Sequence, residues 1–192
     1  MIDRCVIKIG GSLLARRETP SCIARLLRED YAGRQVSLLI GGGKVVDALR
    51  DLDAVHRLSP VEMHWRCIRA LRLTFEIGCE WFPDVTRVST AADFQTLRGC
   101  TAAGTYLIAA DAFYAASHGD ALPQNWSTTS DSIAALLAHR LSAARLVLLK
   151  SCEIPQGLTV EQAAQVGIVD PSLPAAGRGL RIELRSVLAF GR

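Results

Sequence analysis

The chain has 192 residues, of which 49% are hydrophobic and 21% charged, and its formal net charge is +3. This length is enough for one domain with a full core, and no repeat or linker divides it, so we expect a single domain over 1–192. The charge is spread evenly, with 14 basic and 12 acidic side chains in residues 1–96 and 8 and 7 in residues 97–192. This excludes the basic surface that nucleic acid requires, and no apolar run reaches the roughly 18 residues that cross a bilayer.

The N-terminus and the cysteines indicate the compartment. The chain begins with a short apolar run that ends at a Gly-Gly turn rather than with a signal peptide, so we expect a cytoplasmic protein. Its six cysteines form no CxxC pair and no cluster with histidine. We therefore expect reduced thiols, mostly in the core, and no metal-ligand set.

The first half of the chain alternates apolar strands with helices. A strand is expected over residues 4–9, ending at a Gly-Gly-Ser turn, and a helix over 13–30, where apolar residues recur near helical spacing. A second apolar strand, 35–40, ends at three glycines, and a helix over 44–55 opens directly from them. A long helix over 59–82 follows, with Ser59 as its N-cap and Pro60 at its first position; a buried stripe runs along Met63, Cys67, Leu71 and Phe75.

The second half continues the alternation. Strands are expected over 86–90 and 105–114, with a short helix over 91–99 between them. A turn opening a helix covers 126–143, and a core strand covers 145–150. A short helix over 158–167, a loop over 169–179 and a last strand over 180–188 complete the chain. Apolar strands that alternate with helices are typical of an α/β fold with a mainly parallel sheet covered on both faces.

Lysines and glycines gather at the ends of these strands. Of 22 basic residues only Lys8, Lys44 and Lys150 are lysine, and each lies at or near the C-terminal end of an expected strand. Open α/β sheets bind their ligands at that edge. A lone lysine inside an apolar strand requires a partner, because an unpaired buried charge costs several kcal/mol. Two glycine turns, residues 10–12 and 41–43, would let a backbone approach an anion closely, so we expect a phosphate there.

The common phosphate-binding fingerprints are absent. The segment IGGGKVV has neither the spacing nor the Ser/Thr of a P-loop, and no GxGxxG occurs. A third polar feature is the segment NWSTTSDS, in which Asp131 sits at the start of an Ala/Leu helix. Simple helix capping accounts for one such residue but not for the whole run. We therefore treat Asp131, Thr129 and Ser130 as candidate site residues.

The segments VIKIGGSLL, LLIGGGKVVDALR, TSDSIAALLA and RLVLLK occur in the order and spacing of the amino acid kinase superfamily, which the chain resembles over nearly its whole length. That superfamily includes acetylglutamate, aspartate, glutamate and uridylate kinases. The resemblance implies a three-layer αβα sandwich, in-line transfer of the γ-phosphoryl group of ATP with Mg²⁺, a small-molecule acceptor, and a homo-oligomer.

The resemblance also implies roles for individual residues. Lys8 would contact the transferring phosphoryl group, and Asp131 would hold the lysine network around the phosphates. Backbone N–H groups for the phosphoryl group or the acceptor would come from Gly10, Gly11, Gly42 and Gly43. The remaining candidates on the acceptor side are Ser12, Gly41, Lys44, His64, Arg66, Thr129 and Ser130. Lys150 and Ser151 would contact the nucleotide.

In finer detail the chain resembles the kinases of methanofuran-type cofactor biosynthesis, which phosphorylate (aminomethyl)furanmethyl phosphate to its diphosphate. The similar segments are WSTTSDS, the helix LSPVEMHWRCIRALRL that carries His64, and VDPSLP. An acceptor that is already a phosphomonoester would need further cations, and the candidates near the second glycine turn are Arg50, Arg57, Arg66 and Arg69. The alternative for these arginines is a solvated helix surface.

The chain departs from the superfamily after the strand 145–150. A TDVDG-like turn and a long nucleotide-binding excursion are replaced by the short segment SCEIPQGLTVEQ, so that residues 1–125 would form mainly the acceptor side and 126–192 a reduced nucleotide side. The usual second lysine could be replaced by Lys150, Arg178 or Arg181. Two alternatives therefore stay open: a weak or inactive relative that binds a phosphorylated ligand or serves as a partner subunit, and a kinase for another small carboxylate or phosphate.

Overall fold

The computed structural model describes residues 3–119 and 122–187, and it contains a six-stranded sheet in the order β3-β4-β2-β1-β5-β6. Every neighbouring pair of strands is parallel. The strands are β1 Arg4–Ile9, β2 Gln35–Ile40, β3 Thr86–Val88, β4 Gly104–Ile108, β5 Arg145–Lys150 and β6 Arg181–Ser186. The helices are α1 Thr19–Asp30, α2 Gly43–His56, α3 Pro60–Trp81, α4 Ala91–Gly99, α5 Ser130–Arg140, α6 Val160–Gln165 and α7 Leu173–Ala176. The predicted α/β architecture with a parallel sheet is confirmed.

The strand order places a crevice at the carboxyl end of β1. The chain passes from β1 to β2 on one side and returns later to β5 on the other, so β1 pairs with both. Lys8 of β1 stands in register with Leu39 of β2 and Leu148 of β5. A position where the strand order reverses is where open α/β sheets bind ligands, at the carboxyl ends of the strands.

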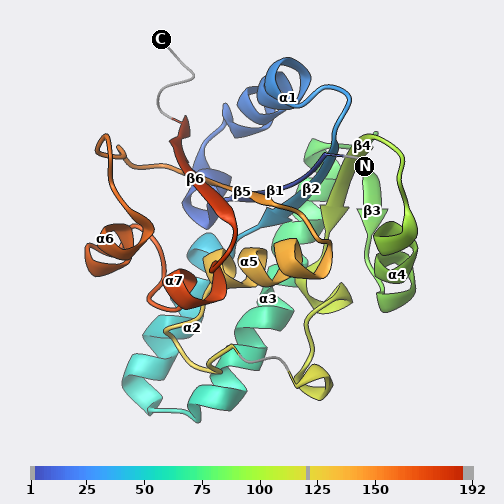
Figure 1. The fold of residues 1–192 in the computed structure, drawn as a ribbon. Helices are drawn as coiled ribbons and strands as arrows, with labels where there is room; N and C mark the ends of the chain where they lie inside the picture. The colour runs from blue at the N-terminus through green and yellow to red at the C-terminus, as the bar shows by residue number, and fades with distance from the viewer. Residues whose placement is uncertain (1–2, 120–121, 188–192) are drawn as a thin grey trace.

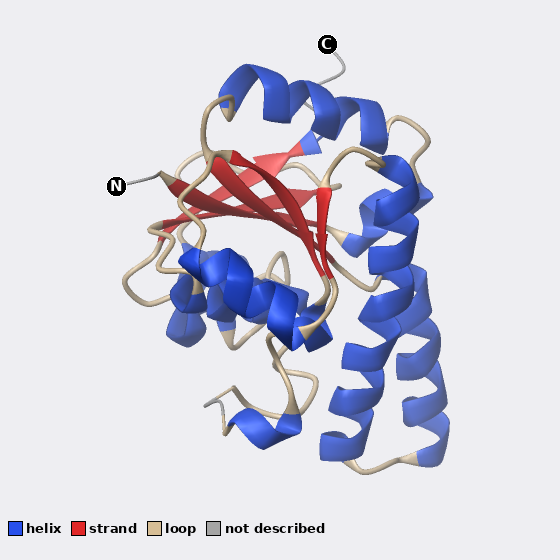
Figure 2. Cartoon of the chain, turned by 90° about the vertical axis from the view of Figure 1, so that its right-hand side faces the viewer, coloured by secondary structure: helices blue, strands red, loops and turns tan. Residues whose placement is uncertain are grey.

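Helices cover both faces of the sheet. In Figure 1, α1 lies above the central strands and α5 below them, and α5 contacts β1, β2 and β5. Helix α3 packs on β2 and β4, where a side chain at Gly78 would collide with Ile40 at 2.3 Å. Helices α2 and α3 pack against each other as a long hairpin that extends away from the sheet, which Figure 2 shows from the side. This arrangement is the predicted three-layer sandwich.

Three predicted elements differ from the structure: the strand over 105–114, the helix over 13–30 and the loop over 169–179. The strand expected over 105–114 ends at Ile108, although its other neighbour, β2, continues to Ile40. The chain turns there into a short 3₁₀ segment, Ala110–Ala112, while Phe113 and Tyr114 remain buried. The apolar run over 105–114 therefore indicates which residues are buried, but it does not indicate where the strand ends.

The helix expected over 13–30 is two elements. A 3₁₀ segment covers Gly11–Ala15 and α1 begins at Thr19, with Pro20 in its first turn, where proline's missing N–H costs nothing. The expected loop 169–179 contains the single turn α7. The predicted last strand extended to Leu188, which lies outside the described residues.

The start and the buried stripe of α3 follow the prediction. The Ser59 side chain accepts a hydrogen bond from the backbone of Glu62 at 3.4 Å, and Pro60 occupies the first turn. Met63, Leu71 and Phe75 are buried in the core. The fourth member of the stripe, Cys67, is half-buried.

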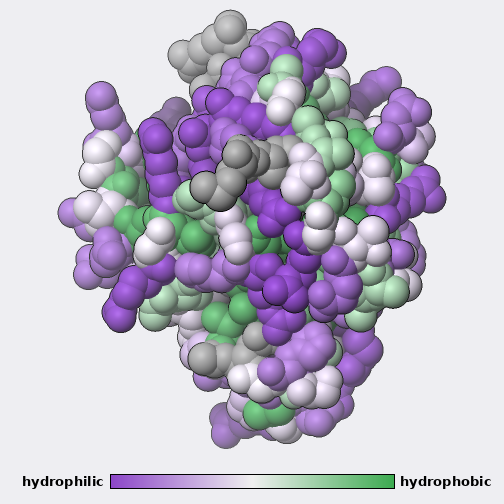
Figure 3. Space-filling view, turned by 45° about the vertical axis from the view of Figure 1, so that its right-hand side comes forward, coloured by the Kyte–Doolittle hydropathy of each residue, from purple (hydrophilic) through white to green (hydrophobic). Residues whose placement is uncertain are grey.

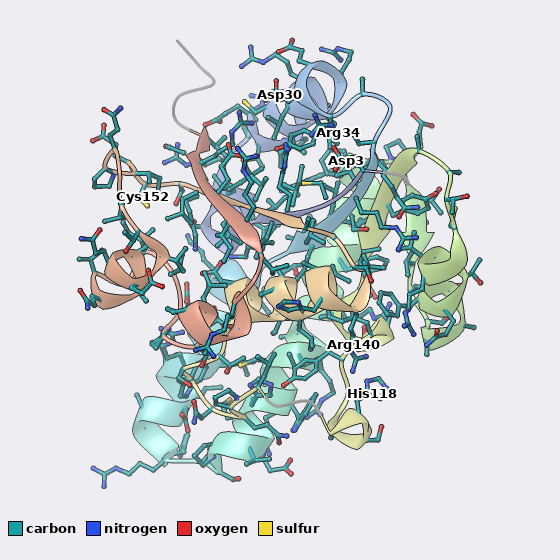
Figure 4. The ribbon with its side chains drawn as sticks, viewed as in Figure 1. Asp3, Asp30, Arg34, His118, Arg140 and Cys152 are labelled. Carbon is teal, nitrogen blue, oxygen red and sulfur yellow. The ribbon has the colours of Figure 1, made fainter. Side chains whose placement is uncertain are left out.

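The surface carries polar side chains with scattered apolar ones, as Figure 3 shows for one face. None of the helices in residues 3–119 and 122–187 is long and apolar enough to cross a membrane. The cysteines are free thiols, but only Cys5 and Cys79 are buried, while Cys152 is exposed in the loop after β5 (Figure 4). At the opposite edge of the sheet, Arg34 and Asp3 pair at 3.3 Å beside the starts of β1 and β2 (Figure 4).

Candidate active site

The two glycine turns touch each other at the carboxyl edge of the sheet. A Cβ on Gly11 would lie 2.0 Å from the backbone nitrogen of Gly43, and a Cβ on Gly43 would lie 2.3 Å from the Gly11 oxygen. Gly43 also has φ +51°, a left-handed conformation that glycine adopts without strain. Backbone therefore packs directly on backbone here, which no other residue type allows.

The glycine N–H groups divide into two sets. The N–H of Gly10 donates to the Leu149 carbonyl and that of Gly41 to the Ile9 carbonyl, both at 2.9 Å, so these two complete the sheet and are not available to a ligand. This corrects the expectation that Gly10 offers its N–H to a phosphate. The N–H groups of Gly43 and Lys44 lie in the first turn of α2, where backbone N–H groups have no hydrogen-bond partner within the helix. The start of a helix favours a bound anion.

The predicted catalytic residues form one buried cluster. Lys8 Nζ lies 2.9 Å from Asp131 Oδ1, and Lys150 Nζ lies 2.7 Å from Asp131 Oδ2. The side chains of Lys8 and Asp131 are 6% and 5% exposed, and that of Lys150 is 11% exposed. Lys150, predicted as a nucleotide contact from the end of β5, thus shares its carboxylate partner with Lys8 of β1.

This cluster carries an excess positive charge. Burial alone would raise the pKa of Asp131, but the charges of Lys8 and Lys150 outweigh burial and hold it below its ordinary value. Burial and the neighbouring Lys8 lower the pKa of Lys150, against the opposing effect of Asp131. One carboxylate therefore faces two ammonium groups, and a bound anion would complete the charge balance.

A cavity of about 250 Å³ opens beside this cluster. Its walls come from both glycine turns, from one side each of α2 and α3, and from the segment that leads into α5. Apolar groups form much of the wall, including Val46, Ile68, Leu71 and Trp126. Polar groups at the glycine end are Ser12, Thr128, Thr129 and Ser130. The cavity therefore joins residues from the first 71 positions with residues 125–133, so it spans the boundary at residue 125 that was expected to divide the acceptor side from the nucleotide side.

The other predicted residues divide between the cavity and the surface. His64 lines the cavity; its Nε2 and the Tyr114 hydroxyl are 2.9 Å apart, the Asn125 backbone bonds to the ring, and burial lowers its pKa. Ser12 lines the same cavity and its hydroxyl lies 2.6 Å from that of Ser151, which joins the two sides of the site. Lys44 is exposed and does not line the cavity.

Of the four predicted arginines, all within the described residues, only Arg50 lines the cavity. Its guanidinium lies 4.6 Å from the centre of the Trp126 ring, and the indole N–H of Trp126 donates to Asp53 Oδ2 at 2.6 Å. Trp126 thus ties the segment before α5 to helix α2 across the cavity. Arg66 lies outside the lining residues, and its buried Nη1 has no hydrogen-bond partner among the described residues.

Two structural partners of the site were missed by the sequence reasoning. Asp170, 5% exposed, accepts hydrogen bonds from the start of α5, and Trp126 closes one side of the cavity. Each lies in a segment that carries the resemblance, VDPSLP and WSTTSDS. The sequence offered one signal, because Asp170 is the single acidic residue of VDPSLP. The sequence could not show its partner, because Asp170 lies about 40 residues from the start of α5.

Comparisons with known proteins agree with this geometry. A sequence model of the amino acid kinase family matches residues 3–153. The fold is similar to that of uridylate kinase from Archaeoglobus fulgidus, with 16% identity, a TM-score of 0.62, and coverage of 94% of this chain and 89% of that one. It is also similar to UMP kinase from Bacillus anthracis, with 14% identity, a TM-score of 0.68, and coverage of 96% and 87%.

A third similar structure is aspartate kinase from Synechocystis, with 19% identity and a TM-score of 0.67; the match covers 96% of this chain but 38% of that one. The comparison with curated proteins gives no match. These structural likenesses establish the fold. The family match ends three residues after β5, at the point where the sequence departs from the family pattern.

Proposed function

The chain belongs to the amino acid kinase family, and we propose that it is an ATP-dependent kinase that phosphorylates a small acceptor which already carries a phosphate. The acceptor we propose is a phosphomonoester furan, converted to its diphosphate in methanofuran-type cofactor biosynthesis. We further propose that the enzyme works in the cytoplasm as a homo-oligomer. The observation that carries the proposal is the buried Asp131 between Lys8 and Lys150. These three residues do not line the cavity themselves, but Lys8 lies against the second glycine turn, which does.

Phosphoryl transfer requires positioning and charge stabilisation more than covalent chemistry by the protein. Lys8 and Lys150 supply two positive charges where the transferring group develops negative charge, and these charges act strongly because they are desolvated. Asp131 is not a base, because its low pKa and two lysine partners keep it ionised and engaged. Its role is to hold both ammonium groups in place.

At the lysine cluster the carboxylate of Asp131 is held by two lysines and is not free to act as a base, while the carboxylate that lines the cavity, Asp47, belongs to α2. This favours an acidic acceptor at the cluster. A hydroxyl acceptor must lose a proton during transfer, whereas a phosphate oxygen is already anionic near neutral pH. His64 is the one histidine that lines the cavity among the described residues, and its ring is engaged by Tyr114 and the Asn125 backbone. A phosphate or carboxylate acceptor therefore suits this site better than an alcohol.

The site residues fit a nucleotide phosphate, but they do not form a protein metal site. The described residues contain no group of three His, Cys, Asp or Glu side chains arranged to hold a metal ion, and Asp131 is already paired with two lysines. Mg²⁺ commonly enters kinase sites on the phosphates of ATP, with few protein ligands. We therefore propose that Mg²⁺ arrives as MgATP, with Lys8 and Lys150 contacting the phosphates.

The cavity supports a compact acceptor with an apolar body. One wall is formed by Ile68, Leu71 and the Trp126 ring, and a small planar ring would pack against them. The single lining guanidinium, Arg50, stacks on Trp126. The glycine turns close the opposite end, where the acceptor phosphate would meet the lysines.

The test is phosphoryl transfer followed by ³¹P NMR, with MgATP and a panel of acceptors: an aminomethylfuran phosphomonoester, UMP, aspartate and acetylglutamate. We expect a diphosphate product from the furan ester alone. Transfer to another member of the panel would support the kinase activity but would show that the proposed acceptor is wrong. The end of the family match at residue 153 favours one alternative, a relative that has lost the nucleotide. Calorimetry that detects acceptor binding but no MgATP binding would establish that alternative.

A further inference from the structure

Helix α5, which carries Asp131, is not capped by its own residues. The side chain of its N-cap residue, Thr129, makes no capping bond within the helix. In α4 and α6, by contrast, a threonine N-cap and the third helical residue form reciprocal capping boxes. Helix α5 therefore starts in a different way from α4 and α6, which also have a threonine at the N-cap.

A single carboxylate from the loop before α7 takes over this role. Asp170 Oδ2 accepts hydrogen bonds from the backbone N–H of Thr129 at 2.9 Å and of Ser132 at 3.0 Å. These are the two N–H groups that a capping box would satisfy. The same carboxylate also accepts from the Thr129 hydroxyl at 2.9 Å and from the Ser132 hydroxyl.

The neighbouring Ser172 extends this contact. Its backbone N–H donates to the Ser127 carbonyl at 3.0 Å, and its hydroxyl lies 3.0 Å from that of Ser127 and accepts from that of Thr128 at 3.2 Å. The loop 170–172 thus binds the whole segment that leads into α5. Asp170 and Ser132 are 5% and 0% exposed, so these bonds are shielded from water.

We propose that Asp170 is a positioning residue, which fixes the first turn of α5 so that the Asp131 carboxylate stands between Lys8 and Lys150. The expected effect of Asp170 on the reaction rate rests on the proposed kinase function. The positioning of Asp131 by Asp170 does not depend on that function. Asp131 lies between the two residues that Asp170 holds, Thr129 and Ser132. A shift of this turn would move the Asp131 carboxylate away from both ammonium groups.

The charges around Lys150 agree with this arrangement. Lys8 of β1, Asp131 of α5 and Asp170 of the loop all act on it, and Asp170 contributes the smallest of the effects that raise its pKa.

The test uses Asp170→Asn, Ser132→Ala and, as a matched control, Asp93→Asn. Asp93 also receives two backbone N–H bonds and a hydroxyl bond at a helix start, from Ser89 and Thr90, but far from the cavity. Asp170→Asn should lower kcat about 10- to 100-fold, with the KM of the acceptor changed less than threefold, because misplaced charges cost rate. Asp93→Asn should leave both constants unchanged.

A second readout does not depend on activity. The chain has three lysines, so ¹³C labelling at lysine Cε gives three NMR signals, which Lys→Arg variants assign. We expect the Lys8 and Lys150 signals to shift in Asp170→Asn and in Ser132→Ala, with Lys44 fixed, and all three to stay unchanged in Asp93→Asn. Unmoved Lys8 and Lys150 signals in folded variants would overturn the proposal. Ser132→Ala, which removes one bond, decides the question if Asp170→Asn fails to fold.

The two readouts separate the two proposals. If the wild-type protein transfers no phosphate to any acceptor, the kinase function fails, while the lysine signals still report whether Asp170 positions Asp131.

Discussion

The cavity side of the molecule and the segment after β5 are built differently. On the cavity side, glycine turns pack backbone against backbone, and β1 lies in the centre of the sheet between β2 and β5. After β5, residues 152–157 are mostly exposed and lead into two short helices. The first region holds its glycine turns by main-chain packing, whereas the second reaches the site through a few side chains, chiefly Ser151 and Asp170.

Substitutions should be tolerated differently in the two regions. Close backbone packing leaves no room for substitution, while side-chain contacts can be replaced one at a time. The structure also shows how a second lysine reaches Asp131. Lys150 ends β5 and reaches Asp131 directly, so no long excursion is needed to bring it there.

The largest effect should come from Lys8→Ala. The charge of Lys8 is buried beside Asp131 and acts most where negative charge develops, so kcat should fall about 10²- to 10³-fold while the acceptor KM changes little. Steady-state kinetics measures both. Arg17→Ala, which removes an exposed cation, is the control. A rise in KM with kcat intact would make Lys8 a binding residue only.

Asp131→Asn should lower activity about 10²-fold and also stability, because removing one partner of a buried ion pair costs about 3–5 kcal/mol. The folded pKa of Asp131 lies below its ordinary 3.8, so its stabilisation is present above that value and is lost as pH falls through the lower folded pKa. Urea unfolding at several pH values measures the free energy of unfolding of wild type and variant. The difference between these two free energies should become smaller below about pH 4. A difference independent of pH would contradict the ion-pair role.

Gly11→Ala tests the backbone packing directly. The new Cβ would lie 2.0 Å from the Gly43 nitrogen, so we expect a loss of about 3 kcal/mol or more in unfolding free energy. Gly99→Ala is the matched control, since nothing lies within 4 Å of its Cβ position. Equal stability of the two variants, measured by urea unfolding, would show that the turns do not touch.

Trp126→Phe removes the hydrogen bond that ties the segment before α5 to Asp53 on α2. Because Trp126 is half-buried, we expect the loss of this hydrogen bond to weaken acceptor binding by about 1 kcal/mol. This corresponds to a roughly fivefold rise in the acceptor KM. Trp81→Phe, a half-buried tryptophan that does not line the cavity, should leave KM unchanged. An unchanged KM in Trp126→Phe would place the acceptor elsewhere.

The smallest effect should come from Ser12→Ala, which breaks the exposed contact with Ser151 between the two sides of the site. An exposed hydrogen bond contributes about 0.5 kcal/mol, so the KM for ATP should rise about twofold. Ser21→Ala, which removes an exposed hydroxyl bond in α1, is the control. A double variant with Ser151→Ala that adds a further twofold loss would show that the two hydroxyls act independently.

The sequence by itself determined the local features of this protein. Alternating apolar strands and helices, Pro60 after Ser59, and glycines after β1 and β2 each act over a few residues, so the parallel sheet and the glycine turns could be predicted. The end of β4 at Ile108 could not, because the apolar run continues to Tyr114 and only the folded chain shows that it turns into a 3₁₀ segment. The resemblance to a known family placed Lys8 and Asp131 in one site before the structure did.

Only the tertiary structure decided which groups meet. The pairing of Lys150 with Asp131, the engaged N–H of Gly10, and the exposure of Lys44 follow from the positions of β5, β1 and α2 around the crevice. The capping of α5 by Asp170 joins residues about 40 positions apart. Such contacts depend on how whole elements pack, because the hydrogen-bonding capacity of one carboxylate does not specify the helix that it will serve.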